Sequence, residues 1–187
     1  MSSELHCDCA KQPALKVREL QAGLFAQACD DCGALAIDLN DYRRWLERRT
    51  VGAAPTPEQC AGMPVEGELA TRKARMCPGC GRPMTRHRAG SQPDFHLDRC
   101  APCQLLVLDG GEWDALMQLG ALEHLELIVS DSWQRRLQAI EATERRRQSL
   151  RQRLGDSTVD ELIRIQTWLN DQPQRRELLA LLNGDPI

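Results

Sequence analysis

Cys77-Pro78-Gly79-Cys80-Gly81 and, further along, Cys100-Ala101-Pro102-Cys103 are the two stretches that decide the fold of this sequence. Two Cys-x-x-Cys pairs separated by about 20 residues fit one tetrahedral metal site, because the two-residue spacer lets both sulfurs of a pair turn toward the same ion. Four thiolates fill the coordination shell and leave no position for water, so such a site is structural rather than catalytic. These four cysteines therefore predict a Zn²⁺ site, with an iron–sulfur cluster or a redox dithiol as the alternatives.

A similar arrangement lies upstream at a constant offset. Shifting the sequence by 71 positions superposes Cys29 on Cys100 and Cys32 on Cys103. The match extends through cysteine, apolar, acidic and aromatic positions, which indicates two copies of one small unit. The other superposed pairs include Cys9 and Cys80, Leu35 and Leu106, Ile37 and Leu108, Asp38 and Asp109, and Tyr42 and Trp113.

The first copy predicts a second metal site whose fourth ligand is ambiguous. Cys9, Cys29 and Cys32 supply three thiolates. The strict repeat register aligns His6 with Cys77, whereas Cys7 would keep four thiolates at the expense of a one-residue spacer. We favour Cys7, because thiolate is the stronger zinc ligand. Two Zn²⁺ ions per chain are then expected, and a metal-free first copy is the alternative.

The chain is predicted to be a small α+β protein made of two tandem zinc ribbons, each of short antiparallel strands followed by a helix, and an all-α C-terminal tail. In the first copy we expect strands at 15–20, 24–28 and 34–37, and in the second at 84–88, 94–98 and 105–108. The predicted domains are ribbon 1 at 1–50, a flexible Pro/Gly linker at 51–71, ribbon 2 at 72–120 and the helical tail at 121–187.

Helix caps are predicted after the last strand of each copy. Asp38 occupies a cap position, and Asp109-Gly110-Gly111-Glu112 has the form of a capping box, in which Asp109 accepts from first-turn amides and Glu112 reaches back to the cap. Gly120 is expected to end the second of these helices. Both aspartates are therefore interpreted as structural. In the tail we expect helices from about 130 to 154, from 158 to 170 and after 171, the last two forming a hairpin.

Composition and cysteine usage exclude several classes of protein. The chain has 187 residues and a formal charge of −3, no apolar run long enough for a membrane span, and a polar amino terminus unlike a signal peptide. Nine cysteines, an odd number, without an export signal predict a reducing cytoplasm, where paired cysteines more often hold metal than disulfides. Cys60 stands alone in the linker and is expected to be an exposed thiol without a role.

The second copy resembles the bacterial family of transcription-factor-IIB-type zinc ribbons. The resemblance lies in the Cys-Pro-x-Cys-Gly knuckle at 77–81, the Cys-x-x-Cys knuckle at 100–103, and the Leu-Asp strand end followed by a helical glutamate at 108–112. It implies a zinc-ribbon fold and a non-enzymatic binding module. The chain departs from the family pattern at Gln104 and Leu105, where the family often has a glycine pair.

A cluster of basic residues adjoins the second copy. It contains no acidic residue and is partly a counter-charge to the anionic metal site. It is also the best candidate for contacts to nucleic acid or phosphate. The residues are Arg72, Lys73, Arg75, Arg82, Arg86 and Arg88.

Taken together, these patterns predict a non-enzymatic zinc-binding adaptor or regulatory protein whose structural metal sites present surfaces to a protein partner, with no membrane association. The alternative is a protein that binds nucleic acid or the transcription machinery through the basic face of ribbon 2. A third reading is a thiol-redox or zinc-release sensor. The sequence contains no phosphate-binding glycine loop, nucleophile elbow or His-Glu-x-x-His motif that would indicate an enzyme.

Overall fold

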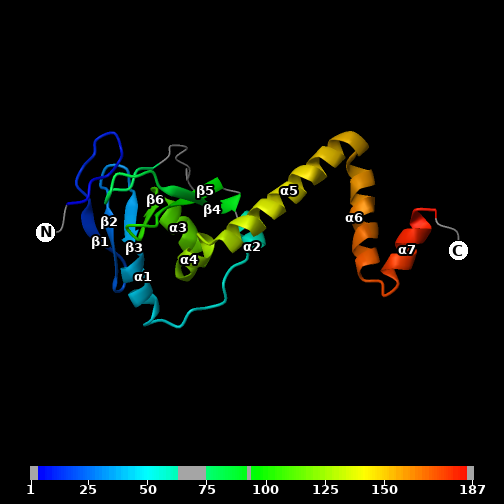
Figure 1. The fold of residues 1–187 in the computed structure, drawn as a ribbon, viewed down its shortest axis with the longest axis horizontal. Helices are drawn as coiled ribbons and strands as arrows, with labels where there is room; N and C mark the ends of the chain where they lie inside the picture. The colour runs from blue at the N-terminus through cyan, green and yellow to red at the C-terminus, as the bar shows by residue number, and fades with distance from the viewer. Residues whose placement is uncertain (1–3, 63–74, 92–93, 185–187) are drawn as a thin grey trace. The chain divides into compact units, whose positions relative to one another are not determined.

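A computed structural model describes residues 4–62, 75–91 and 94–184 of the chain (Figure 1). It divides into two compact units, residues 1–139 and residues 140–187. Both predicted metal sites fall in the first unit. Within the described ranges, no helix combines the length and the apolar character that crossing a membrane would require.

The first copy of the repeat forms three antiparallel strands and a helix. β1 and β2 are joined by a tight turn at Gly23, which takes a left-handed φ of +79° that suits glycine. The strands lie within a residue of the predicted ranges. The elements are β1 (Lys16–Gln21), β2 (Leu24–Ala28), β3 (Leu35–Asp38) and α1 (Leu39–Leu46).

The second copy forms its strands and helix in the same order. Its hairpin is longer than predicted, and its last strand has the predicted bounds. The elements are β4 (Thr85–Ser91), β5 (Asp94–Cys100), β6 (Leu105–Leu108) and α3 (Glu112–Gln118).

The strands of the two copies join into one sheet, whereas the sequence predicts two separate ribbons. The order is β1-β2-β3-β6-β5-β4, and β3 pairs with β6 in antiparallel fashion at the centre. Ala36 pairs with Val107, its own equivalent in the repeat, while Leu35 pairs with Leu108 and Ile37 with Leu106. The repeat therefore closes on itself about a local two-fold axis, as two subunits of a symmetric dimer do.

Both faces of this central strand pair are buried, which explains why Leu105–Leu108 is a continuous apolar run rather than an alternating one. One face, carrying Ile37 and Leu106, packs against α1, α3 and the segment after α3 (Figure 1). The other face, carrying Ala36 and Val107, packs against Cys77 and Cys100. The cysteine groups thus lie against the side of the sheet opposite the helices.

The first part of the predicted tail belongs to the core of the first unit. A short 3₁₀ turn, η1 (Leu122–His124), leads into α4 (Leu125–Ile128) and then α5 (Asp131–Leu154). The Tyr42 hydroxyl donates to the Leu122 carbonyl at 2.9 Å and accepts from the Leu125 amide at 3.2 Å. Because the start of α5 is also buried at Trp133 and Leu137, the boundary between the units falls inside this helix and not at residue 121.

The second unit contains the remainder of α5, then α6 (Asp156–Asn170) and α7 (Arg175–Leu182). The three predicted tail helices therefore form, with starts that differ by a few residues from the predicted ones. In Figure 1, α6 and α7 lie on either side of the turn that joins them.

The predicted flexible linker contains a helix, α2 (Pro57–Gly62), that packs against β4. Its Glu58 pairs with Arg136 of α5 at 2.9 Å. Cys60 is 2% exposed and belongs to the main hydrophobic core, so the expectation of an exposed thiol is wrong. Sequence periodicity missed this helix because it is only six residues long and lies within a Pro- and Gly-rich stretch. The rest of the predicted linker, 63–71, lies outside the described residues.

Candidate metal centres

The second copy brings together the four cysteines that its two knuckles predict. One sulfur from each of Cys77, Cys80, Cys100 and Cys103 lies within 4.8 Å of the others. The first pair precedes β4, whereas Cys100 is the last residue of β5 and Cys103 lies in the turn before β6. The Sγ atoms of Cys80 and Cys100 are 3.7 Å apart.

Backbone hydrogen bonds shape the first knuckle of this group. The Gly81 amide donates to the Cys77 carbonyl at 2.8 Å, with Gly81 in the left-handed conformation at φ +68°. The Gly79 amide points at the Cys77 sulfur at 3.4 Å, a contact that stabilises a thiolate. After the second knuckle, Gln104 holds the left-handed position at φ +51°, where a side chain is disfavoured. The departure from the glycine pattern noted in the sequence therefore falls at a backbone position that suits glycine.

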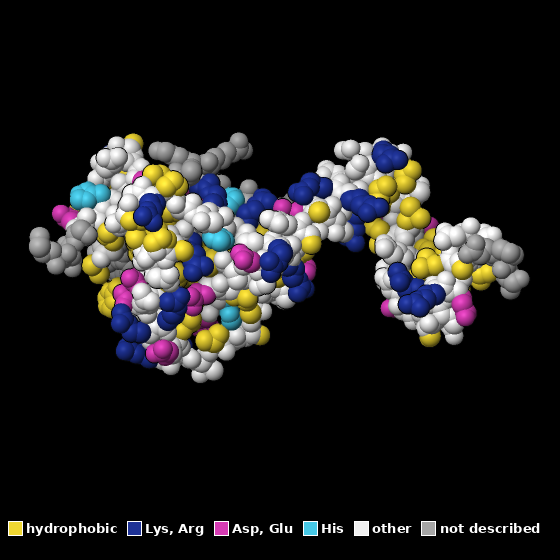
Figure 2. All heavy atoms as spheres, viewed as in Figure 1, with side chains coloured by type: hydrophobic (Ala, Val, Ile, Leu, Met, Phe, Trp, Pro, Cys, Tyr) yellow, Lys and Arg dark blue, Asp and Glu magenta, His cyan; other side chains and the backbone are white. Residues whose placement is uncertain are grey.

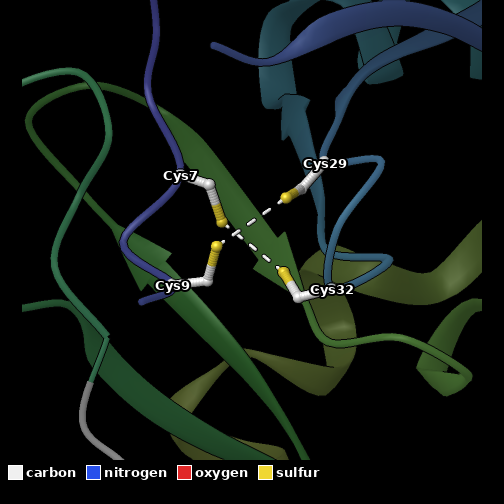
Figure 3. A group of neighbouring side chains, drawn as sticks. All are labelled: Cys7, Cys9, Cys29 and Cys32. Carbon is white, nitrogen blue, oxygen red and sulfur yellow. Dashed lines mark hydrogen bonds between the residues drawn. The ribbon is translucent and has the colours of Figure 1, made fainter. Parts of the chain in front are cut away.

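The first copy forms a second group of four cysteines (Figure 3). Sulfur atoms of Cys7, Cys9, Cys29 and Cys32 lie within 4.8 Å of one another. Two sulfur pairs cross the group, Cys7 to Cys32 at 3.6 Å and Cys9 to Cys29 at 4.0 Å. The Cys29 knuckle repeats the geometry of the Cys77 knuckle, because Gly33 at φ +74° donates its amide to the Cys29 carbonyl at 3.0 Å.

Cys7, and not His6, is the fourth member of this group. His6 is exposed and its ring nitrogen Nδ1 lies 3.2 Å from the Glu4 carbonyl. His6 forms a single antiparallel bridge with Ala14, as Met76 does with Pro83 in the second copy. His6 is thus the structural equivalent of Met76, and Cys7 that of Cys77. The strict repeat register fails here because the first knuckle is one residue shorter, Cys7-Asp8-Cys9 in place of Cys77-Pro78-Gly79-Cys80.

The sulfur spacing and the donor set of both groups fit a tetrahedral metal ion. Zinc–sulfur bonds of about 2.3 Å at tetrahedral angles separate the sulfurs by about 3.8 Å. The observed separations are 3.6, 3.7 and 4.0 Å. A disulfide would need about 2.0 Å, and all nine cysteines are free thiols. Each group therefore could hold a metal ion through four sulfur ligands.

The pKa values of the cysteine thiols differ within each group. Burial raises the pKa of Cys7 to about 12. The Arg82 amide lowers the pKa of Cys80 to about 7, and the hydrogen bond from Cys103 to that sulfur raises the pKa of Cys103 to about 12. In the absence of a cation, neighbouring sulfurs therefore share protons, because four adjacent thiolates would repel one another. A divalent ion displaces these protons and makes the fully ionised set favourable.

Arg75 connects the two copies at the first metal group. The sequence predicts it as a contact to nucleic acid, yet it is 8% exposed. Its guanidinium forms ion pairs with Asp8, between the cysteines of the first knuckle, and with Asp109, at the end of β6. Nη1 also lies 4.0 Å from the Cys7 sulfur. The Asp8 carboxylate in addition accepts from the Met76 amide at 3.1 Å.

The other basic residues that the structure describes are placed differently from Arg75. Arg86 pairs with the buried Asp98 at 3.2 Å across the β4–β5 hairpin. The backbone of Arg88 binds the Gln134 side chain through both its amide, at 3.1 Å, and its carbonyl, at 2.9 Å. Arg82 is exposed. Arg72 and Lys73 lie outside the described residues.

The two predicted caps behave differently. Asp38 caps α1, accepting from the amides of Asn40 at 2.7 Å and Asp41 at 3.2 Å. Asp109 gives its carboxylate to Arg75 instead of to the first turn of α3, so its predicted cap role is wrong. The other half of the capping box is confirmed, because Glu112 accepts from the Asp109 amide at 2.6 Å. No sequence pattern indicates the Asp8–Arg75–Asp109 bridge, because its three members are far apart along the chain.

No protein-family model, curated protein or solved structure matches this chain. The metal groups are therefore interpreted from their own geometry.

Proposed function

We propose that the protein is a non-enzymatic zinc-binding adaptor, with two structural Zn²⁺ centres that stabilise one shared sheet and leave its helical surfaces to bind a protein partner. The observation that carries this proposal is the pair of four-sulfur groups at tetrahedral spacing. Zinc is favoured over other metals because an all-thiolate tetrahedral shell suits it.

A structural role follows from the shell and its position. Four thiolates per ion leave no site for a substrate or an activated water. Each group joins a knuckle outside the sheet to a turn between two strands, so a bound ion would fasten the ends of the hairpins together. Zinc binding contributes on the order of 10 kcal/mol to folding in small zinc modules, which suits a chain whose cysteine face has few large apolar side chains. The proposal includes the resemblance of the cysteine knuckles to those of transcription-factor-IIB-type zinc ribbons.

The proposal predicts two zinc ions per chain in the purified protein. Elemental analysis by mass spectrometry, with a thiol count on the same sample, measures this directly. Cys100→Ser should lower the zinc content by at least one ion per chain, because it removes a ligand from one of the two groups. Cys60→Ser is the matched control and should retain both ions. Zinc near zero with intact thiols, or an iron–sulfur absorption band, would contradict the proposal.

The nucleic-acid reading has less support than the adaptor. Six basic residues suggested nucleic-acid binding. Of these, Arg75 is buried and forms ion pairs with Asp8 and Asp109, and Arg86 is paired with Asp98. The redox reading rests on Cys32 and Cys80, the exposed member of each group. Mild oxidant that releases zinc reversibly from the loaded protein would favour it over the adaptor.

A further inference from the structure

The helices of the second unit bury very little apolar surface. Among the described residues of 140–187, only Val159 and Leu169 are buried. Large apolar side chains on the same helices are exposed by 37 to 66%. Helices of this length are stabilised mainly by packing an apolar face against another surface. The exposed apolar side chains of this unit therefore indicate a binding surface. The exposed residues are Leu154, Leu162, Ile165, Trp168, Leu181 and Leu182.

A groove of about 410 Å³ lies between the second half of α5 and α6. Leu150 and Val159 form part of its apolar lining, and Leu162, which also lines it, is 48% exposed. Figure 2 shows hydrophobic side chains beside Lys and Arg side chains on this unit. A groove between two helices with an apolar floor suits a third, amphipathic helix.

The charged residues that line this groove are both positive. Arg146 and Arg147 line it, and none of the residues that line it is acidic. Arg147 is held only by a long contact of 3.8 Å to Glu144. By contrast, Arg151 on the same helix is engaged by Asp156 at 3.3 Å and Asp160 at 2.5 Å, and it is not among the residues that line the groove. The rim therefore complements a partner with carboxylates beside its apolar stripe.

We propose that this groove docks an amphipathic helix of a partner protein that carries acidic residues along the edge of its apolar face. A second copy of the chain fits less well. Its helix α7 presents Leu181 and Leu182, but its first turn carries two arginines, Arg175 and Arg176, against one acid, Glu177, and so offers the basic rim no net negative charge. The inference names the partner class of the adaptor proposed above and rests on that proposal.

The test uses the full zinc-loaded chain and two fluorescein-labelled peptides. Both are short helix-forming peptides with leucines at i, i+3, i+4 and i+7, one flanked by glutamates and the other by lysines at the same positions. Fluorescence anisotropy should show the glutamate peptide binding at least about tenfold more tightly than the lysine peptide, with an affinity that falls as salt rises.

Three variants place the binding on the groove. Arg146→Glu should weaken the glutamate peptide by at least about fivefold, because it reverses a charge on the rim. Arg153→Glu makes the same charge change on the same helix, outside the residues that line the groove, and should leave binding within about twofold. Leu162→Glu should abolish binding, and circular dichroism of this variant checks that its helices remain formed.

Equal binding of the two peptides, or equal effects of Arg146→Glu and Arg153→Glu, would overturn the inference. Concentration-dependent dimerisation in sedimentation that Leu162→Glu abolishes would also overturn it, by identifying a second copy as the occupant. Zinc analysis on the same samples separates the two proposals. Two zinc ions with no selective peptide binding refute only the groove, whereas selective binding without zinc refutes only the metal centres.

Discussion

At the scale of single residues, Glu112 is a buried acid whose pKa is raised by the fold. It is 2% exposed, and its two carboxyl oxygens accept from the backbone amides of His96 at 3.1 Å and Asp109 at 2.6 Å. Burial raises the pKa of Glu112 to about 8, and nearby Asp98 acts in the same direction, while the His96 amide, Arg86 and Arg75 oppose it. The fold therefore favours the protonated carboxyl.

This raised pKa predicts a pH dependence of known sign. Because the folded state keeps the Glu112 proton after the unfolded chain has lost it, the free energy of unfolding should fall as pH rises from about 4.5 to about 8. Glu112→Gln removes that titration. Urea unfolding of the zinc-loaded proteins at pH 6.5 and pH 8 should show the wild type losing roughly 1 kcal/mol more than the variant. Parallel losses in the two proteins would show that Glu112 does not titrate in this range.

Cys60 provides a second prediction at this scale. It lies in the core at 2% exposure, and burial raises the pKa of its thiol to about 11. We expect Cys60 to stay unmodified by a thiol reagent in the native protein and to react once the chain unfolds, because the thiolate is the reactive form. Peptide mapping after alkylation, with and without denaturant, measures this. Rapid native labelling of Cys60 would place it outside the core.

At the scale of elements, the segment before β4 is tied to the first knuckle by Arg75. The bridge from Asp8 through Arg75 to Asp109 links the metal group of one copy to the strand end of the other. Since each partner lies near or within the protein interior, removing the cation would leave two carboxylates partly buried without compensation. The two metal groups are therefore expected to depend on each other, although each has its own four ligands.

Arg75→Met tests this dependence. The variant should lower the free energy of unfolding by about 2–4 kcal/mol, because it breaks buried ion pairs by removing one partner. It should also weaken zinc at the first group, in which the Arg75 guanidinium lies close to the Cys7 sulfur. Chemical unfolding and competition with a chromogenic chelator give the two measurements. Arg82→Met, at an exposed arginine of the same loop, should change neither, and a comparable effect there would argue against the bridge.

At the scale of the whole molecule, the pairing of β3 with β6 makes the two copies one folding unit. These strands lie at the centre of the sheet and are buried on both faces, and each covers the hydrogen-bonding edge of the other. A single copy would expose that edge and an apolar face beside it.

The consequence is that the first copy should not fold by itself. A chain of residues 1–62 with excess zinc should give a poorly dispersed amide NMR spectrum, even though all four cysteines of its group are present. The full chain should give a dispersed one, and exhaustive chelation of it should cause loss of dispersion throughout residues 1–139. A folded 1–62 fragment would show that the copies are independent, as the sequence predicts.

Much of the local structure follows from sequence because it depends on near neighbours. The knuckles, strands and Asp38 cap are specified by residue types at short spacing, and the eight cysteines that the structure groups include the seven predicted without ambiguity. The His6 and Cys7 alternatives could not be separated by register, since the one-residue deletion inside the knuckle shifts the alignment and only the bridge of His6 to Ala14 reveals it.

By itself, then, the sequence determined where the chain turns back on itself and which sulfurs could share an ion, because those features are encoded within a few residues or by a repeated pattern. The tertiary structure alone decided that the two copies share one sheet, that Arg75 and Cys60 are buried, and that a basic groove opens between α5 and α6. These features depend on contacts between segments that are far apart in the chain. Such contacts form because they bury apolar surface and pair buried charges.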